Sequence, residues 1–342
     1  MSYNILPLFI PFAGCKNRCV YCNQNHITGI NDNLLLSSVK DQLKNYLSLP
    51  VVWDEIAFYG GSFTCLKRDD RLLFLDLVRK HSNLPMRVST NPACITNQII
   101  DELTSYKVKV VELGVQSLSD NVLQKNGRNY TVETSLNTIR ILGKKFKVGI
   151  QLMCGMYEET IEDFIGTVGI LKREIFDFSR IYPTVVLQQT ALEQLYHKGV
   201  YKPLSAHDAI KYAAFLYIHF ISSNIKVIRM GLHCNNDIKK FVVAGPYHPA
   251  FGDLVKTFIL AMYLNCKNTI TVGSRYLSSA YGYRGILRSC FGDQISISKY
   301  NKQIDWYNIC KKILGTNCES CSWILEEQTD YFAKKIAYKA NN

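Results

Sequence analysis

Residues 15–22 of this sequence are Cys15-Lys-Asn-Arg-Cys19-Val-Tyr-Cys22, close behind the apolar run Ile5–Phe12. Thiolates are the preferred protein ligands of iron–sulfur clusters. Three of them on a four-iron cluster leave one iron without a protein ligand, and an open metal position is where chemistry takes place. Two other interpretations are a structural zinc site, with His26 as the nearby fourth ligand, and a group of buried thiols without metal. The spacing therefore favours a metal centre on Cys15, Cys19 and Cys22.

This cysteine pattern resembles the C-x3-C-x-aromatic-C motif of the radical S-adenosylmethionine (SAM) superfamily. The resemblance implies a [4Fe–4S] cluster whose fourth iron binds the amine and carboxylate of the methionine part of SAM. In that family, one electron from the cluster cleaves SAM to methionine and a 5′-deoxyadenosyl radical, which takes a hydrogen atom from a substrate. It also implies an electron donor such as flavodoxin or ferredoxin.

Strand-like and helix-like segments alternate from the first residues onward, which is typical of βα units around a parallel sheet. Six such units match the partial (β/α)6 barrel of radical SAM cores, so we expect an α/β fold of TIM type with an open side. A helix at 205–223 and a strand at 225–230 are expected to complete this core. The six expected strands are 6–12, 55–59, 86–92, 108–117, 146–153 and 178–183.

A Gly60-Gly61-Ser62 turn follows the second expected strand. Glycines at a strand end let the backbone approach a ligand or adopt a positive φ, although a plain tight turn has the same composition. The turn resembles the Gly-Gly-Glu-type motif that binds the SAM amino group through its backbone. Ser62 stands here in place of the commoner acidic residue, so the resemblance implies a backbone role.

Four polar residues lie at or just beyond other strand ends. Each alone is an ordinary surface residue, but together they resemble the positions by which oxygen-independent coproporphyrinogen dehydrogenases and their relatives hold the ribose and carboxylate of SAM. Arg128 suits a carboxylate because a guanidinium group donates two parallel hydrogen bonds, whereas Gln151 replaces an acidic residue of those enzymes. The four residues are Ser89, Gln116, Arg128 and Gln151.

Four further segments resemble the radical SAM part of the Elongator catalytic subunit family. That family modifies wobble uridines of tRNA and carries a C-terminal acetyltransferase domain. The resemblance covers about residues 1–232, and the glycine-rich phosphate loop of the acetyltransferase is absent from this sequence, so acetyl-CoA chemistry is not implied. The segments are Val111–Ser117, Thr131–Glu133, Ile181–Thr184 and Lys226–Arg229.

The composition favours a folded protein with a polyanionic partner. Lys and Arg number 40 against 28 Asp and Glu, a net charge of +12, and 47% of the residues are apolar. Such an excess favours nucleic acid, while a composition bias of the source organism explains it equally well. Because the twelve cysteines are scattered and no charged-then-apolar leader opens the chain, we expect reduced thiols in the cytoplasm. The apolar runs 212–221 and 258–264 are too short to span a membrane.

Beyond the expected barrel, the sequence predicts a Gly/Pro loop with a connecting helix and then a small basic α/β module. The module's order of strand, helix, Gly-x-x-Gly, helix and strand resembles the core of KH-type RNA-binding folds, in which the glycine loop clamps phosphates. An α/β module that binds no nucleic acid is the alternative. The predicted boundaries are 1–232, 233–268 and 269–342, and the candidate RNA-binding residues are Gly282, Arg284, Gly285, Arg275 and Arg288.

Four cysteines in the C-terminal region could hold a second metal, although unpaired thiols fit the spacing as well. They are Cys290, Cys310, Cys318 and Cys321.

Together these patterns predict a radical SAM enzyme that acts on RNA, with tRNA modification as the expected class. A radical SAM enzyme for a small molecule such as a tetrapyrrole is the first alternative. A non-enzymatic, cluster-bearing binding protein that holds SAM as a structural ligand is the second. The complete cysteine triad with Gly60-Gly61 argues against the second, and the net charge with the Gly282–Gly285 loop favours RNA.

Overall fold

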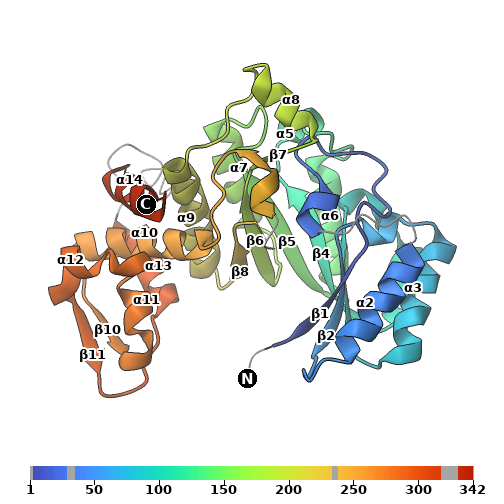
Figure 1. Ribbon diagram of the computed structural model, residues 1–342, viewed down its shortest axis with the longest axis horizontal. Helices are drawn as coiled ribbons and strands as arrows, with labels where there is room; N and C mark the ends of the chain where they lie inside the picture. Colours follow the sequence, from blue (N-terminus) through green and yellow to red (C-terminus); the bar gives the residue numbers. More distant parts are fainter. Residues whose placement is uncertain (1–2, 29–34, 233–237, 317–329, 342) are drawn as a thin grey trace.

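The computed structural model describes residues 3–28, 35–232, 238–316 and 330–341. Within these ranges a sheet of seven parallel strands forms the core, in the order β1-β2-β3-β4-β5-β6-β8. Figure 1 shows the sheet curling into a partial barrel, with β1 at one end and β8 at the other. The strands are β1 (Ile5–Phe9), β2 (Glu55–Tyr59), β3 (Met86–Thr90), β4 (Val108–Gln116), β5 (Lys147–Cys154), β6 (Phe178–Pro183) and β8 (Lys226–Met230).

Helices on the outer face connect these strands, as right-handed crossovers of parallel sheets require. Side-chain caps start several of them: the Thr160 hydroxyl accepts the Asp163 N–H, and the Asp163 carboxylate accepts the Thr160 N–H, which is a capping box. The crossover helices are α2 (Leu35–Leu47), α3 (Arg68–His81), α4 (Asn97–Ser105), α5 (Asp120–Lys125), α6 (Val132–Leu142), α7 (Ile161–Leu171) and α9 (Ala206–Ser222).

The predicted α/β partial barrel is confirmed. The strand expected at 225–230 is β8, and it adds to the sheet in parallel beside β6 as a seventh strand. All six earlier strands agree with the predicted ranges to within a few residues. β2 is buried along nearly its whole length, whereas burial alternates along β1, whose Ile5, Pro7 and Phe9 line the barrel cavity.

The C-terminal helices pack on α9 rather than standing apart. Figure 1 shows them at the β8 end of the sheet, and one buried apolar cluster extends from β1 to Ala337. Lys211 of α9 donates to Asp330 at 2.5 Å, which ties the last helix to the barrel. This cluster is continuous across residues 232 and 268, and the domain boundaries predicted there stay a prediction. The helices are α10 (Phe251–Asn265), α13 (Trp306–Thr316) and α14 (Asp330–Asn341).

Two short parallel strands, β10 (Ile270–Gly273) and β11 (Ile295–Ser298), form the small sheet of the C-terminal region. Between them lie α11 (Leu277–Ala280), the turn η5 (Tyr283–Gly285) and α12 (Arg288–Phe291). The predicted order of elements is therefore present, although each helix is a single turn.

Short elements surround the carboxyl ends of the barrel strands. The segment expected to be a Gly/Pro loop contains a short strand, β9 (Val242–Ala244). This strand pairs antiparallel with β7 (Val186–Leu187). Apolar side chains of both strands pack in small clusters at the barrel mouth. The other elements there are α1 (Gln24–Thr28), η1 (Phe63–Cys65), η2 (Pro92–Cys94), α8 (Ala191–His197) and η3 (Ile238–Phe241).

Cys65 and Cys94 form a disulfide, which corrects the expectation of reduced thiols for these two residues, whereas the other cysteines within the described ranges are free. The two cysteines end short turns that follow β2 and β3, and these strands are neighbours in the sheet. Parallel neighbours bring their carboxyl ends side by side, so residues far apart in sequence meet there. No helix in the described ranges is long and apolar enough to cross a membrane.

A substitution at Gly61 tests the packing of the turn after β2. A Cβ at this position would lie 2.4 Å from the Ala13 carbonyl oxygen and 2.7 Å from that of Ile10. We expect Gly61→Ala to lower the free energy of unfolding by about 1–3 kcal/mol, because backbone must move to make room. Chemical denaturation measures this change.

Gly166 in α7 is the matched control, since a Cβ there meets nothing within 4 Å. Gly166→Ala should stabilise the protein by about 0.5–1 kcal/mol through helix propensity. Equal unfolding free energies for the two variants would show that the turn does not depend on the absence of a side chain at Gly61.

Candidate metal and cofactor site

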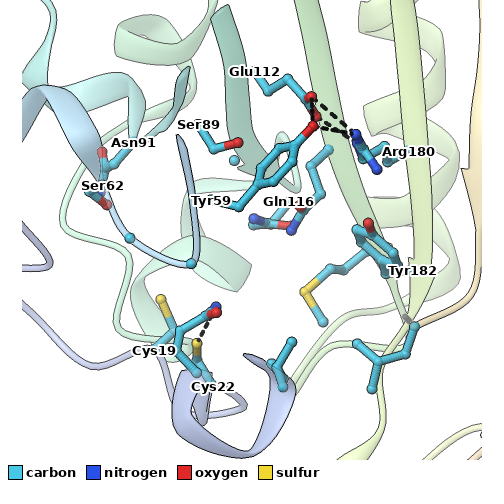
Figure 2. Close-up of a pocket in the computed structure, with 18 of the residues that line it drawn as sticks. Cys19, Cys22, Tyr59, Ser62, Ser89, Asn91, Glu112, Gln116, Arg180 and Tyr182 are labelled. Carbon is cyan, nitrogen blue, oxygen red and sulfur yellow. Dashed lines mark hydrogen bonds and ion pairs between the residues drawn. The ribbon is translucent and has the colours of Figure 1, made fainter. Parts of the chain in front are cut away.

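A cavity of about 480 Å³ opens at the carboxyl ends of the barrel strands, where parallel α/β folds bind their ligands. The three cysteines of the motif line it together with every cofactor-binding residue predicted from the sequence. Figure 2 shows Cys19 and Cys22 on one side of this space and polar side chains of the strands on the other. The lining residues that the sequence predicted are Cys15, Cys19, Cys22, Gly60, Gly61, Ser62, Ser89, Gln116, Arg128 and Gln151.

Backbone contacts fix the cysteine loop from two sides. The Ser62 N–H donates to the Ala13 carbonyl at 2.8 Å, beside the close approach of Gly61. On the other side, the Val20 N–H donates to the Asn126 carbonyl at 3.3 Å, and the Leu192 N–H donates to the Val20 carbonyl at 2.7 Å. The loop is thus held by three segments distant in sequence.

The thiols have polar neighbours inside the cavity. Arg128 Nη1 donates to Cys19 Sγ at 3.3 Å, Gln24 Nε2 donates to Cys22 Sγ at 3.3 Å, and Cys15 Sγ lies 3.5 Å from Ser62 Oγ. Burial raises the pKa of Cys22 to about 12, and it also raises the pKa of Cys15. Thiolates in such a position need positive charge beside them, which a bound metal cluster supplies. The donor set therefore fits an iron–sulfur cluster.

The zinc interpretation finds no support at His26. Its ring stacks on Phe241, with centroids 3.9 Å apart, and its Nδ1 is buried without a hydrogen-bond partner among the described residues. This stacking connects α1 to η3 and closes one wall of the mouth. His26 is not among the described residues that line the cavity.

Arg128 is more deeply engaged than the sequence indicates. Its Nε donates to the Tyr130 hydroxyl at 2.9 Å, and its Nη2 contacts the Gly114 carbonyl. A Cβ on Gly114 would lie 3.3 Å from that Nη2 atom, so the glycine makes room for the guanidinium. Arg128 thereby holds a positive charge between the end of β4 and Cys19.

The glutamines at the ends of β4 and β5 contact each other across the sheet. Gln151 Nε2 donates to Gln116 Oε1 at 3.3 Å, and Gln116 has a positive φ of 68° at the point where β4 ends. Asn91, beside Ser89, also lines the cavity, as Figure 2 shows. Sequence reasoning missed Asn91, although its place directly after β3 is the same signal that identified Ser89.

A buried ionic network forms the deep end of the cavity, and the sequence analysis missed it entirely. Glu112 of β4 accepts from Arg180 Nε at 2.6 Å and from Arg87 Nη1 at 2.8 Å. Arg87 also pairs with Glu55 at 2.7 Å, and Tyr59 donates to Glu112 at 3.2 Å. Figure 2 shows Tyr59, Glu112 and Arg180 meeting above Gln116.

Charge explains the behaviour of this network. Although burial disfavours an ionised carboxylate, Arg180 and Arg87 hold the pKa of Glu112 below its ordinary value. Burial and the neighbouring Glu112 raise the pKa of Tyr59, which stays neutral. The two arginines and two carboxylates of the network balance in charge, while Arg229, the register partner of Arg180 on β8, also lines the cavity and adds a positive charge. The signal for this network in the sequence is Glu112, a charged residue within the largely apolar strand β4.

The remaining wall of the cavity is apolar. It comes from α1, β5 to β7 and the segment after β8. Tyr21 also lines the cavity, and its buried hydroxyl has no hydrogen-bond partner in the described part of the chain. An apolar wall with a few oriented polar groups is typical of small-molecule and cofactor sites. Its apolar residues include Ile27, Met153, Val185, Leu187 and Leu232.

The predicted RNA-binding residues lie away from this cavity, in the C-terminal region. Arg275, Arg284 and Arg288 are exposed. The first glycine of the loop, Gly282, packs against Thr257 of α10, whereas Gly285 has open space at its Cα. Only one of the two glycines is therefore accessible in the manner that a phosphate clamp requires.

The predicted second metal site is not assembled by the described residues. Cys290 is exposed and accepts from Lys335 Nζ at 3.2 Å, whereas Cys310 is buried. Cys318 and Cys321 lie outside the described residues.

Comparisons with known proteins agree with this geometry. Residues 9–171 match the model of the radical SAM superfamily, and residues 176–259 match the radical SAM C-terminal domain. The chain belongs to the radical SAM superfamily. The prediction of an enzyme of this superfamily is confirmed, while its substrate stays a prediction.

Relatives include two kinds of tRNA-modifying enzyme. A tRNA uridine(34) acetyltransferase of Methanocaldococcus infernus is 26% identical over 61% of this chain and 38% of its own length. A tRNA-2-methylthio-N(6)-dimethylallyladenosine synthase of Clostridium novyi is 26% identical over 66% of this chain and 54% of its own length. The chain thus spans about half or less of these relatives.

Among solved structures, archaeal Elp3 from Methanocaldococcus infernus superposes with a TM-score of 0.59 at 19% identity. The match covers 81% of the present chain and 68% of the Elp3 chain. It shows that the fold is shared and confirms the predicted likeness to the Elongator catalytic subunit at the level of the fold.

Glu112→Gln tests the ionic network. Replacing this carboxylate leaves Arg180 buried without its charged partner, so we expect the free energy of unfolding to fall by about 3–5 kcal/mol. Asp101→Asn, which breaks an exposed pair with Lys145, is the control and should cost less than about 1 kcal/mol. Similar losses in both variants, measured by denaturant titration, would contradict a stabilising role for the network.

Proposed function

We propose that the protein is a radical SAM enzyme that binds a [4Fe–4S] cluster and SAM in the barrel cavity and acts on RNA, with tRNA modification as its reaction class. The observation that carries the first part is the convergence of three cysteines and seven predicted cofactor-binding residues on one cavity. These ten residues come from separate strand ends and loops, so their meeting is not a consequence of proximity in the sequence.

Three cysteines would hold the cluster, and the polar strand ends would hold SAM. When bound, the cluster supplies the electron for reductive cleavage of SAM. Cys15, Cys19 and Cys22 provide three thiolate ligands, and Arg128 places a positive charge next to Cys19. That charge is also suited to a carboxylate group of SAM.

Backbone and amide groups on the opposite side would orient the rest of SAM. The Gly60-Gly61 backbone faces the cavity without side chains, which allows close approach to an amino group. Ser89, Gln116 and Gln151 offer hydroxyl and amide groups suited to ribose hydroxyls. The ionic network of Glu112 then closes the deep end and keeps water from the reacting atoms, in keeping with its burial.

The apolar wall and Tyr182 line the part of the cavity in which a reacting group of the substrate would lie. A protein that held SAM only as a structural ligand would not need that space. An electron donor of the flavodoxin or ferredoxin class would complete the system.

Three observations support RNA as the substrate. The chain carries a net charge of +12, exposed arginines gather in the C-terminal region, and relatives from two groups are named for tRNA modification. The net charge would also serve the carboxylates of a tetrapyrrole, but the exposed C-terminal arginines lie outside the lining of the barrel cavity in which a small molecule would bind, so RNA has the broader support.

Cys19→Ala tests the cluster assignment. We expect anaerobically reconstituted protein to bind about four irons per chain and the variant to lose them, because the site then has two thiolates. Iron analysis and detection of 5′-deoxyadenosine after reduction measure the effect. Cys266→Ala, which removes an exposed free thiol, should keep both properties. Full iron loading and SAM cleavage in the Cys19 variant would overturn the assignment.

Charge reversal in the C-terminal region tests the RNA assignment. We expect the triple variant Arg275→Glu, Arg284→Glu, Arg288→Glu to lower affinity for tRNA by about tenfold or more and to flatten the dependence of affinity on salt. Filter binding between about 50 and 200 mM salt measures both quantities.

The matched control reverses three exposed lysines on the α3, β4 and α6 side of the barrel: Lys80→Glu, Lys109→Glu, Lys144→Glu. It changes the net charge by the same amount, so a loss confined to the arginine variant locates the contact. An equal loss in both would show only a general charge effect, and no tRNA binding by the unsubstituted protein would contradict the RNA substrate.

A further inference from the structure

A second cavity, of about 410 Å³, lies in the C-terminal region between α10, the turn at 282–284 and the start of α13. It is separate from the barrel cavity, with which it shares no lining residue. Most of its lining side chains are aromatic, cationic or small and polar. They are Asp253, Lys256, Thr257, Tyr276, Ser278, Ser279, Gly282, Tyr283, Arg284, Gln303, Ile304 and Trp306.

Aromatic rings in this cavity are held in place by their neighbours. Trp306 meets Tyr217 of α9 edge to face, with ring centroids 5.8 Å apart and an angle of 82°. Tyr283 meets His248 edge to face at 5.4 Å and 89°. Both rings are half-buried, so each keeps part of its surface toward the cavity while its orientation is fixed.

Cationic groups accompany both rings. Lys256 Nζ lies 5.8 Å from the centroid of the Trp306 ring, and the Arg284 guanidinium lies 5.5 Å from that of Tyr283. Arg284 adopts a left-handed conformation with φ of 50°, which is unusual for a residue with a side chain. Against these two cations the described residues of the lining include one carboxylate, Asp253, so the cavity favours an anionic ligand.

The packing of the turn gives the first glycine of the Gly-x-x-Gly motif a role that the sequence did not indicate. The Tyr283 N–H donates to Thr257 Oγ1 at 2.7 Å, and a Cβ on Gly282 would lie 2.6 Å from the Thr257 side chain. Gly282 therefore lets the turn rest on α10, and this contact brings Tyr283 and Arg284 to the same cavity as Lys256 and Trp306.

We propose that this cavity binds one nucleotide of a single-stranded RNA segment. The base would stack on Trp306, and the phosphate would lie near Lys256 and Arg284. Aromatic faces combined with cations are the general means of binding single-stranded nucleic acid, and each stacked base contributes about 1–3 kcal/mol. A base within a duplex presents no free face, so an unpaired segment is required. The inference rests on the proposed RNA substrate and assigns it a site outside the barrel.

The test compares binding of a short single-stranded RNA with binding of the same oligonucleotide lacking its bases. We expect the unsubstituted protein to prefer the RNA with bases, and Trp306→Leu to lower that affinity by about 5- to 150-fold without changing the salt dependence. Trp306→Phe should keep most of the affinity, since it keeps an aromatic face. Tyr307→Leu, an exposed neighbour outside the cavity lining, should bind as the unsubstituted protein does.

Trp306 also packs on the barrel helix α9, so replacing it affects the fold as well as the cavity. Lys256→Gln is a second variant that leaves this packing in place. It should lower affinity for both oligonucleotides and reduce the salt slope by about one phosphate contact. Thermal unfolding checks that each variant is folded. Should Trp306→Leu fail to fold, a normal salt slope and normal affinity in Lys256→Gln would overturn the inference.

The outcomes separate this inference from the proposed function. RNA binding that is unchanged in Trp306→Leu, or equal affinity for the oligonucleotide without bases, would overturn the nucleotide site and leave the RNA substrate standing. No RNA binding by the unsubstituted protein would overturn both.

Discussion

The site depends on the close contact between two backbone segments, the Gly60-Gly61-Ser62 turn and the loop that leads into the cysteines. With no side chain on Gly61, the turn lies against the carbonyl groups of Ile10 and Ala13. The Ser62 N–H then donates to Ala13. This contact places Cys15 beside Ser62 and brings the cysteine loop over the end of β2. A single Cβ in this interface would separate the three cysteines of the motif from the wall that faces them.

A second constraint operates at the deep end of the same cavity. The network of Glu55, Arg87, Glu112 and Arg180 joins β2, β3, β4 and β6 through buried ion pairs. Removing charges from water is costly unless each has a partner, and here every carboxylate of the network meets a guanidinium. The barrel can therefore remain open on one side while its polar interior stays in one arrangement. That rigidity is what a site for a reactive intermediate requires.

Much of the fold and of the candidate metal site could be predicted because the signals are local. The cysteine spacing, the glycines after β2 and the polar residues at strand ends all identify positions on a parallel sheet whose strand ends meet. The Cys65–Cys94 disulfide, the Glu112 network and the contact of Trp306 with Lys256 could not be predicted in this way. Each depends on which strands or helices are neighbours and in what register, and a single sequence does not state these relations.

In the proposed function, the three cysteines and the polar strand ends enclose one site for a cluster and SAM. Electron–nuclear double resonance tests this arrangement. The sample is the reduced, reconstituted protein with SAM that carries nitrogen-15 in its amino group. We expect a coupling between the cluster and the labelled nitrogen, because three cysteine ligands would leave the fourth iron open to the amino group of SAM. A fully loaded cluster with bound SAM and no such coupling would contradict it.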